Sequence, residues 1–125
     1  MDYYYKEYWD DGHFMHGWVL YKDNGIIAGK CGFEIEKDGQ IEIGSGYPSV
    51  LSVSEGYHKR GLGKRIMNTT IEYAIECALA EDIHPKEVFG TTRADNEKMI
   101  SIFLASGFVN GNSQSEILRF TRPVK

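Results

Sequence analysis

The sequence has few cysteines, no clustered metal ligands and no excess of basic charge, and each shortage excludes a class of protein. Its two cysteines, Cys31 and Cys77, lie in apolar-patterned segments of a 125-residue chain, which is typical of reduced, packed thiols and not of a disulfide scaffold. Four scattered histidines form no HExxH or Cys/His cluster, so we expect no metal site. A net charge of −4 argues against a nucleic-acid partner.

Long apolar runs and a basic leader are missing as well. No segment reaches the roughly 18 consecutive apolar residues of a membrane span, so we expect no membrane partner. The first residues, MDYYYKEYWDD, are acidic and aromatic, the opposite of a signal peptide. Because the sequence contains neither a repeat nor a linker, we expect one cytoplasmic domain over residues 1–125.

The first half is rich in strand-forming residues separated by turn signals. WVLYK (18–22), IIAGKCGFEIE (26–36) and the interrupted pair QIEIG and VLSV (40–53) are separated by DNG and KDG turns. We expect an antiparallel meander of three strands, with the third broken or bulged near Ser45-Gly46. Residues 1–17 form an aromatic segment ahead of the first expected strand.

The second half alternates helix and strand patterns. From Leu62 the apolar residues recur every three or four positions, which predicts a helix ending before His84-Pro85. EVFGTT predicts a strand, Asp95 or Asn96 can cap a second helix, and Ser106-Gly107 can close it. EILRFTRP supplies a last strand. This order indicates an α+β fold with a single mixed, mostly antiparallel sheet flanked by helices.

The stretch SEGYHKRGLG joins the third strand to the first helix. Its glycines at 61 and 63 would let an anion approach the backbone, where unpaired N–H groups and the helix dipole meet. The Walker pattern is not matched because Arg65 follows Lys64, and the Rossmann pattern would need a third glycine at Ile66. A plain basic turn without a ligand is the alternative.

The residues around this turn carry a resemblance. V-S-E-G-Y-H-K-R-G-L-G, 53–63, is similar to the strand-to-helix signature V-x-P-x-Y-[QR]-x-x-G-x-[GA] of the GNAT acetyltransferase superfamily. Downstream, N-E-K-M-I-S-I-F-L-A-S-G-F, 96–108, resembles that family's N-x-x-[AS]-x-x-[LF]-[YF]-x-x-x-G-F. Both signatures occur in order on a matching strand and helix pattern, so the chain resembles a short GNAT member.

The resemblance implies a binding mode for acetyl-CoA as co-substrate. The cofactor would lie in a V-shaped splay between the strand ending at Val53 and the strand at 87–92, with its pantetheine arm against the backbone and its pyrophosphate on the glycine turn. The cofactor-binding residues implied in this way are Leu51, Val53, His58, Lys59, Arg60, Gly61, Leu62, Gly63, Lys64, Asn96 and Phe103.

Three positions depart from the family pattern. His58 stands where the family prefers glutamine or arginine, and Phe103 stands where a tyrosine often acts as general acid. The family also opens with a strand and two helices, whereas residues 1–17 are short. This segment could fold over the site as an aromatic lid, or a second subunit could complete the site, which leaves a homodimer open.

The resemblance implies direct attack by a primary amine on the thioester, without a covalent enzyme intermediate. The amine must lose a proton, so we expect a carboxylate, or a water that it orients, as the base. Glu42 is the first choice because it lies on the central strand upstream of the splay, and Glu34 has the same ambiguity between base and surface residue. Either glutamate could instead be a surface residue, and Tyr57 is either an acid or a packed aromatic. The acceptor would be a small-molecule or protein amine. The alternative is a catalytically weak or inactive CoA-binding module, because Phe103 cannot protonate a thiolate.

Overall fold

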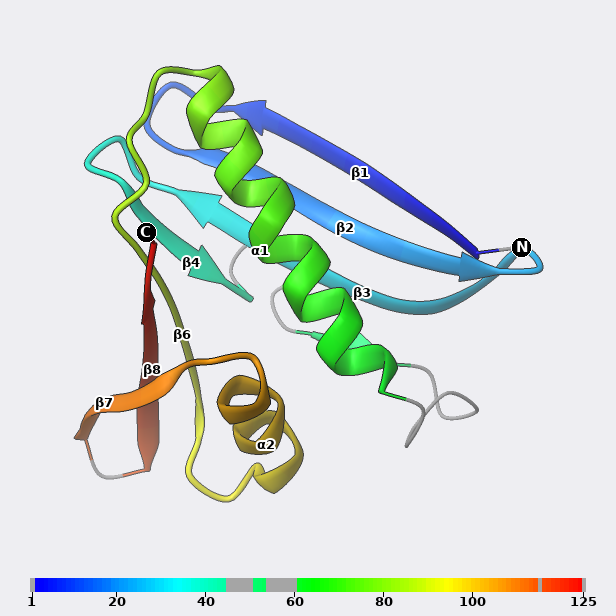
Figure 1. Cartoon of the computed structure of the whole chain (residues 1–125), viewed down its shortest axis with the longest axis vertical. Coiled ribbons are helices and arrows are strands. Elements are labelled where there is room, and N and C mark those ends of the chain that lie inside the picture. The colour runs from blue at the N-terminus through cyan, green and yellow to red at the C-terminus, as the bar shows by residue number, and fades with distance from the viewer. Residues whose placement is uncertain (1, 45–50, 54–60, 115, 125) are drawn as a thin grey trace.

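The computed structural model describes residues 2–44, 51–53, 61–114 and 116–124 (Figure 1). In these ranges the chain forms, in order, β1 (Asp2–Asp10), β2 (Met15–Asp23), β3 (Ile26–Ile35), β4 (Gln40–Ile43), β5 (Ser52–Val53), α1 (Leu62–Ala80), β6 (Glu87–Arg93), α2 (Glu97–Ala105), β7 (Val109–Gln114) and β8 (Ile117–Pro123). Neither α1 nor α2 combines the length and the apolar character that a membrane crossing needs.

The strands form one mixed sheet. Their order is β1-β2-β3-β4-β6-β8-β7, and β5 pairs with β3 off this path. The pairing of β4 with β6 is parallel, and the other described pairings are antiparallel. The α+β prediction with a mixed, mostly antiparallel sheet is therefore confirmed.

The expected third strand consists of two pieces that pair with different parts of β3. β4 pairs with the end of β3, where Ile43 lies opposite Phe33, and β5 pairs further back, where Val53 lies opposite Gly29. Of these two pieces, β4 pairs with β6 and β5 does not. β5 and β6 therefore separate, as the expected V-shaped splay requires. The break predicted at Ser45-Gly46 lies outside the described residues.

The N-terminal segment differs from the expectation. Residues 2–10 form an edge strand paired with β2 along its full length, and β2 begins at Met15, before the expected start at Trp18. A short turn over residues 11–14 joins β1 to β2. Most of the described side chains of β1 are exposed, so both of its faces carry polar or aromatic residues. The sequence of β1 therefore lacks the apolar–polar alternation that would predict a strand. A second strand, β7, was also missed, since Val109 is the one large apolar residue in VNGNSQ.

Both helices cover the same face of the sheet. α1 crosses β2 and β3 (Figure 1), and Tyr73 on α1 packs edge-on against Phe33 at 5.8 Å. On the β6 side, the Phe103 ring of α2 stacks on Phe120 of β8 at 5.0 Å. Phe120 is in register with Gly90, which lies on the same face of β6 as Val88. Ile71 of α1 borders the same cavity as Val88, so α1 and α2 lie on the same side of β6. The apolar core therefore lies between this face and the two helices.

No described helix covers the opposite face of the sheet, which we call the open face. A cross-strand row of side chains runs over it through six strands. In register, the row is Trp9, His16, Glu34, Glu42, Phe89 and Thr121. Two carboxylates and a histidine thus lie between Trp9 on the edge strand β1 and Phe89 on β6.

Candidate active site

The N-terminus of α1 meets the expected glycine turn. Gly61 is its N-cap residue with φ 72° and provides no side-chain cap, so a residue without a Cβ suits this left-handed position. The first turn of a helix leaves backbone N–H groups without an intrahelical acceptor and concentrates the positive end of the helix dipole. No acidic side chain occupies the first turn of α1. This end of α1 is therefore suited to an anion.

The N-terminus of α2 lies nearby and is capped. The Asn96 side chain accepts a hydrogen bond of 3.2 Å from the backbone N–H of Met99. Between the two helices, a Cβ added to Gly63 would lie 2.9 Å from Cδ1 of Ile102 and 3.5 Å from Cδ2 of Leu51. Glycine at 63 thus allows α1, α2 and the chain entering β5 to approach closely.

These elements border one cavity of about 740 Å³. It is lined by Leu51, Ser52, Val53, Gly61, Leu62, Gly63, Lys64, Asn96, Lys98, Met99, Ser101, Ile102 and Ala105. The volume lies in the range of about 300–1,000 Å³ that is usual for small-molecule sites. The N-termini of both helices contribute to it, so the positive ends of two helix dipoles face the same space.

Seven of the residues predicted to bind the cofactor line this cavity together, although they come from three separate segments. They are Leu51, Val53, Gly61, Leu62, Gly63, Lys64 and Asn96. The predicted residues Tyr57, His58, Lys59 and Arg60 lie outside the described residues. The sequence analysis missed Met99 and Ile102, whose spacing of three residues on α2 gives them a common face.

Phe103 requires a correction, because it does not line the cavity. Its ring is 1% exposed and packs against Phe108 and Phe120, with both ring centroids 5.0 Å away. A Cβ at Gly90 would lie 2.5 Å from its ring tip, so the missing side chain at 90 makes room for this ring. Phe103 is a core residue beneath the point where β6 separates from β4.

The open face holds a cluster of ionisable side chains at its β1–β3 end. Nε2 of His16 lies 2.6 Å from Oδ2 of Asp11, its Nδ1 lies 3.7 Å from Oε2 of Glu34, and Trp9 stacks on the imidazole ring. Hydrogen bonds from the Phe14 amide and the His16 ring hold the pKa of Asp11 well below its usual range. Asp11 is therefore a carboxylate at neutral pH. Glu42 is half-buried and lies one strand beyond Glu34, opposite Phe89.

The two thiols are unsuited to nucleophilic chemistry. Burial raises the pKa of Cys31 to about 12 and that of Cys77 to about 11. Both side chains are buried and free of disulfides. Since the thiolate is the nucleophile, neither cysteine provides one at neutral pH.

Replacing Asn96 with alanine should lower the free energy of unfolding by about 0.5–2 kcal/mol, because the Met99 N–H loses its acceptor. Asn96→Asp keeps the oxygen at the helix N-terminus and should cost much less. Chemical denaturation of the two variants beside the wild type measures the difference. Equal losses for alanine and aspartate would show that the cap contributes nothing.

The split third strand, the two converging helix N-termini and the strand order define the fold of an acetyltransferase. The chain belongs to the acetyltransferase (GNAT) family, whose model matches residues 1–108. A comparison with curated proteins finds no match.

Solved structures support the same fold. The N-acetyltransferase PseH of Campylobacter jejuni, in complex with acetyl coenzyme A, is 16% identical with a TM-score of 0.69, over 88% of this chain and 69% of that one. A GNAT-family acetyltransferase from Streptococcus pneumoniae is 20% identical with a TM-score of 0.66, over 88% and 67%. A GNAT-family protein from Desulfovibrio desulfuricans is 10% identical with a TM-score of 0.71, over 86% and 68%.

Proposed function

We propose that this protein transfers the acetyl group of acetyl-CoA to an amine. The observation that carries the proposal is the cavity of about 740 Å³ at the N-termini of α1 and α2, because seven residues matching the family's cofactor positions line it. The structure of PseH in complex with acetyl coenzyme A has the same fold and supports acetyl-CoA as the co-substrate.

In this proposal the pantetheine arm lies along Leu51 and Val53, and the pyrophosphate lies on the first turn of α1 at Gly61–Lys64. His58, Lys59 and Arg60 would complete the anion site from the preceding turn. Asn96 borders the cavity, so its amide lies near the arm while its side-chain oxygen caps α2.

The acceptor amine would approach from the open face. There, the row from Trp9 to Phe89 offers carboxylates for a cationic group and aromatic rings for its apolar part. Glu42 is the proposed base. It pairs with Phe89 at the last described position of the β4–β6 ladder, so it lies next to the point where the two strands separate. The amine nitrogen attacks the thioester carbonyl carbon, its proton passes to Glu42, and the C–S bond breaks to release CoA.

The test is release of CoA thiol in the presence of a panel of primary amines. With an accepted amine, Glu42→Gln should lower kcat by about 10²–10⁴-fold, because a positioned base is lost. Glu34→Gln is the matched control, since Glu34 lies directly opposite Glu42 on the same face, and it should lose far less. Equal activity of Glu42→Gln and wild type would exclude Glu42 as the base.

The second candidate is a CoA-binding module without turnover. The observation that favours it is Phe103, which has no hydroxyl and is 1% exposed, so it cannot supply the acid that a tyrosine provides. The two functions separate in the same assay. Acetyl-CoA binding without thiol release for any amine would support the module, and amine-dependent release would support the enzyme.

A further inference from the structure

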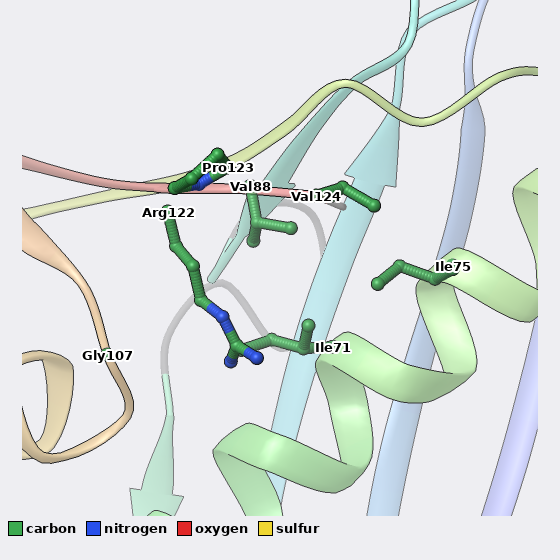
Figure 2. A pocket seen from close by; sticks show the side chains of 7 residues that line it. All are labelled: Ile71, Ile75, Val88, Gly107, Arg122, Pro123 and Val124. Atoms are coloured by element: carbon green, nitrogen blue, oxygen red, sulfur yellow. The ribbon is translucent and has the colours of Figure 1, made fainter.

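A second cavity, of about 520 Å³, lies on the helix-covered face between α1 and β8 (Figure 2). It is lined by Ile71, Ile75, Val88, Gly107, Arg122, Pro123 and Val124. It shares no lining residue with the candidate active site. Its volume also lies in the range of about 300–1,000 Å³ of small-molecule sites.

The walls of this cavity are mostly aliphatic, with a single charged group. Ile71 and Ile75 come from successive turns of α1, while Val88 and Val124 face them from the sheet side. The Arg122 side chain extends from β8 toward Ile71, so its guanidinium lies at one end of the apolar space (Figure 2). A ligand here would meet hydrocarbon along its body and a positive charge at one end.

The guanidinium of Arg122 has hydrogen-bonding capacity to spare. Its Nη1 donates one hydrogen bond of 3.1 Å to the Ser106 carbonyl at the end of α2. A guanidinium has five N–H donors. Within the described residues, no carboxylate lies within ion-pair distance of Arg122, whereas Arg119 on the same strand pairs with Glu87. The half-buried guanidinium therefore keeps donors available beside the cavity, and an anion is the group that would accept hydrogen bonds from them.

Capping of α2 explains one N–H of Arg122 but not the open aliphatic space beside it. Gly107 has φ 87°, and a Cβ there would lie 3.8 Å from Nε of Arg122, so glycine leaves the side of the guanidinium uncovered. Arginine recognises carboxylates through two parallel hydrogen bonds, and the aliphatic walls favour a hydrocarbon body.

We propose that this cavity binds an aliphatic monocarboxylate, with the carboxylate on Arg122 and the hydrocarbon chain against Ile71, Ile75, Val88 and Val124. This binding site goes beyond the proposed acetyl transfer and does not depend on it.

Hexanoate is the probe. Hexanol, which lacks the charge, tests the need for the carboxylate, and acetate, which lacks the long chain, tests the need for the hydrocarbon. Titration into ¹⁵N-labelled protein should show saturable shifts at the amides of Ile71, Ile75, Val88 and Val124 with hexanoate, and much weaker binding of both controls. Equal binding of hexanol, or no binding of hexanoate by folded protein, would overturn the proposal. Shifts at Gly61–Lys64 instead would place hexanoate in the other cavity and overturn it as well.

Arg122→Met keeps the apolar stem and removes the charge, so hexanoate affinity should fall at least about tenfold. Arg119→Met is the matched control, because Arg119 lies on the same strand but faces Phe89 on the open face. If Arg122→Met does not fold, Ile75→Glu carries the test. This change, at a half-buried position, places a competing carboxylate in the cavity and should also weaken hexanoate by at least about tenfold. Unchanged hexanoate affinity in either folded variant would refute the site.

Discussion

Gly61→Asp should weaken acetyl-CoA binding by about 30- to 150-fold, whereas Gly61→Asn should retain most of the affinity. Asparagine and aspartate both tolerate the left-handed conformation at φ 72°, and a Cβ at this position meets nothing within 4 Å. The two variants therefore share their backbone strain and their size. They differ in one negative charge at the N-terminus of α1, where the pyrophosphate is proposed to lie.

That charge has a large effect because the site is built for an anion. At about 6 Å and an effective dielectric near 20, repulsion between two unit charges is roughly 2–3 kcal/mol, or about 30- to 150-fold in Kd. An aspartate at a helix N-terminus also favours the helix, so loss of binding would not come from unfolding.

Calorimetric titration of acetyl-CoA and CoA into both variants, with thermal unfolding as a check of folding, measures the effect. Matching affinities for the aspartate and asparagine variants would mean that the turn holds no phosphate. The proposed function would then lose its main support.

Gly39→Ala should lower the free energy of unfolding by about 2–5 kcal/mol, the sum of a strained backbone and a steric clash. Gly39 has φ 99°, and its Cβ would meet the carbonyl oxygen of His84 and lie 3.1 Å from Cγ of Lys86. The Lys86 N–H also donates to the Gly39 carbonyl at 2.9 Å. The turn before β4 is thus fixed to the segment entering β6, and a backbone carbonyl cannot rotate away as a side chain can.

Gly25→Ala is the control for this prediction. Gly25 has φ 80°, but its Cβ would meet nothing within 4 Å, so the substitution carries the backbone strain without the clash. Urea denaturation of both variants should show a clearly smaller loss for Gly25→Ala. A loss of the same size at both positions would show that the contact with His84 has no energetic consequence.

The sequence predicted the two helices well because their signals are local. The three- and four-residue period marks α1, and the asparagine before α2 is its observed cap. The glycines at 61 and 63 lie in the turn and first helical residues that line the cavity, and a motif places them there without knowledge of the packing.

Signals that depend on distant parts of the chain were lost. β1 is an edge strand and alternates weakly, so its partner β2 defines it more than its own residues do. The direction of the Phe103 ring depends on the missing side chain at Gly90 and on Phe120, neither of which its own helix reveals. The row on the open face joins residues of six strands and becomes visible when the register is known.

In the part of the chain that the structure describes, β4 and β6 pair at three positions, Gln40–Glu42 with Glu87–Phe89. This short parallel seam joins the β1–β5 half of the sheet to the β6–β8–β7 half, and parallel pairing is slightly less stable per residue than antiparallel pairing. The two halves of the sheet therefore share few backbone hydrogen bonds with each other. A molecule bound in the cavity would contact β5 in one half and α2, which packs on β8 of the other half, so its binding would help to hold the two halves together.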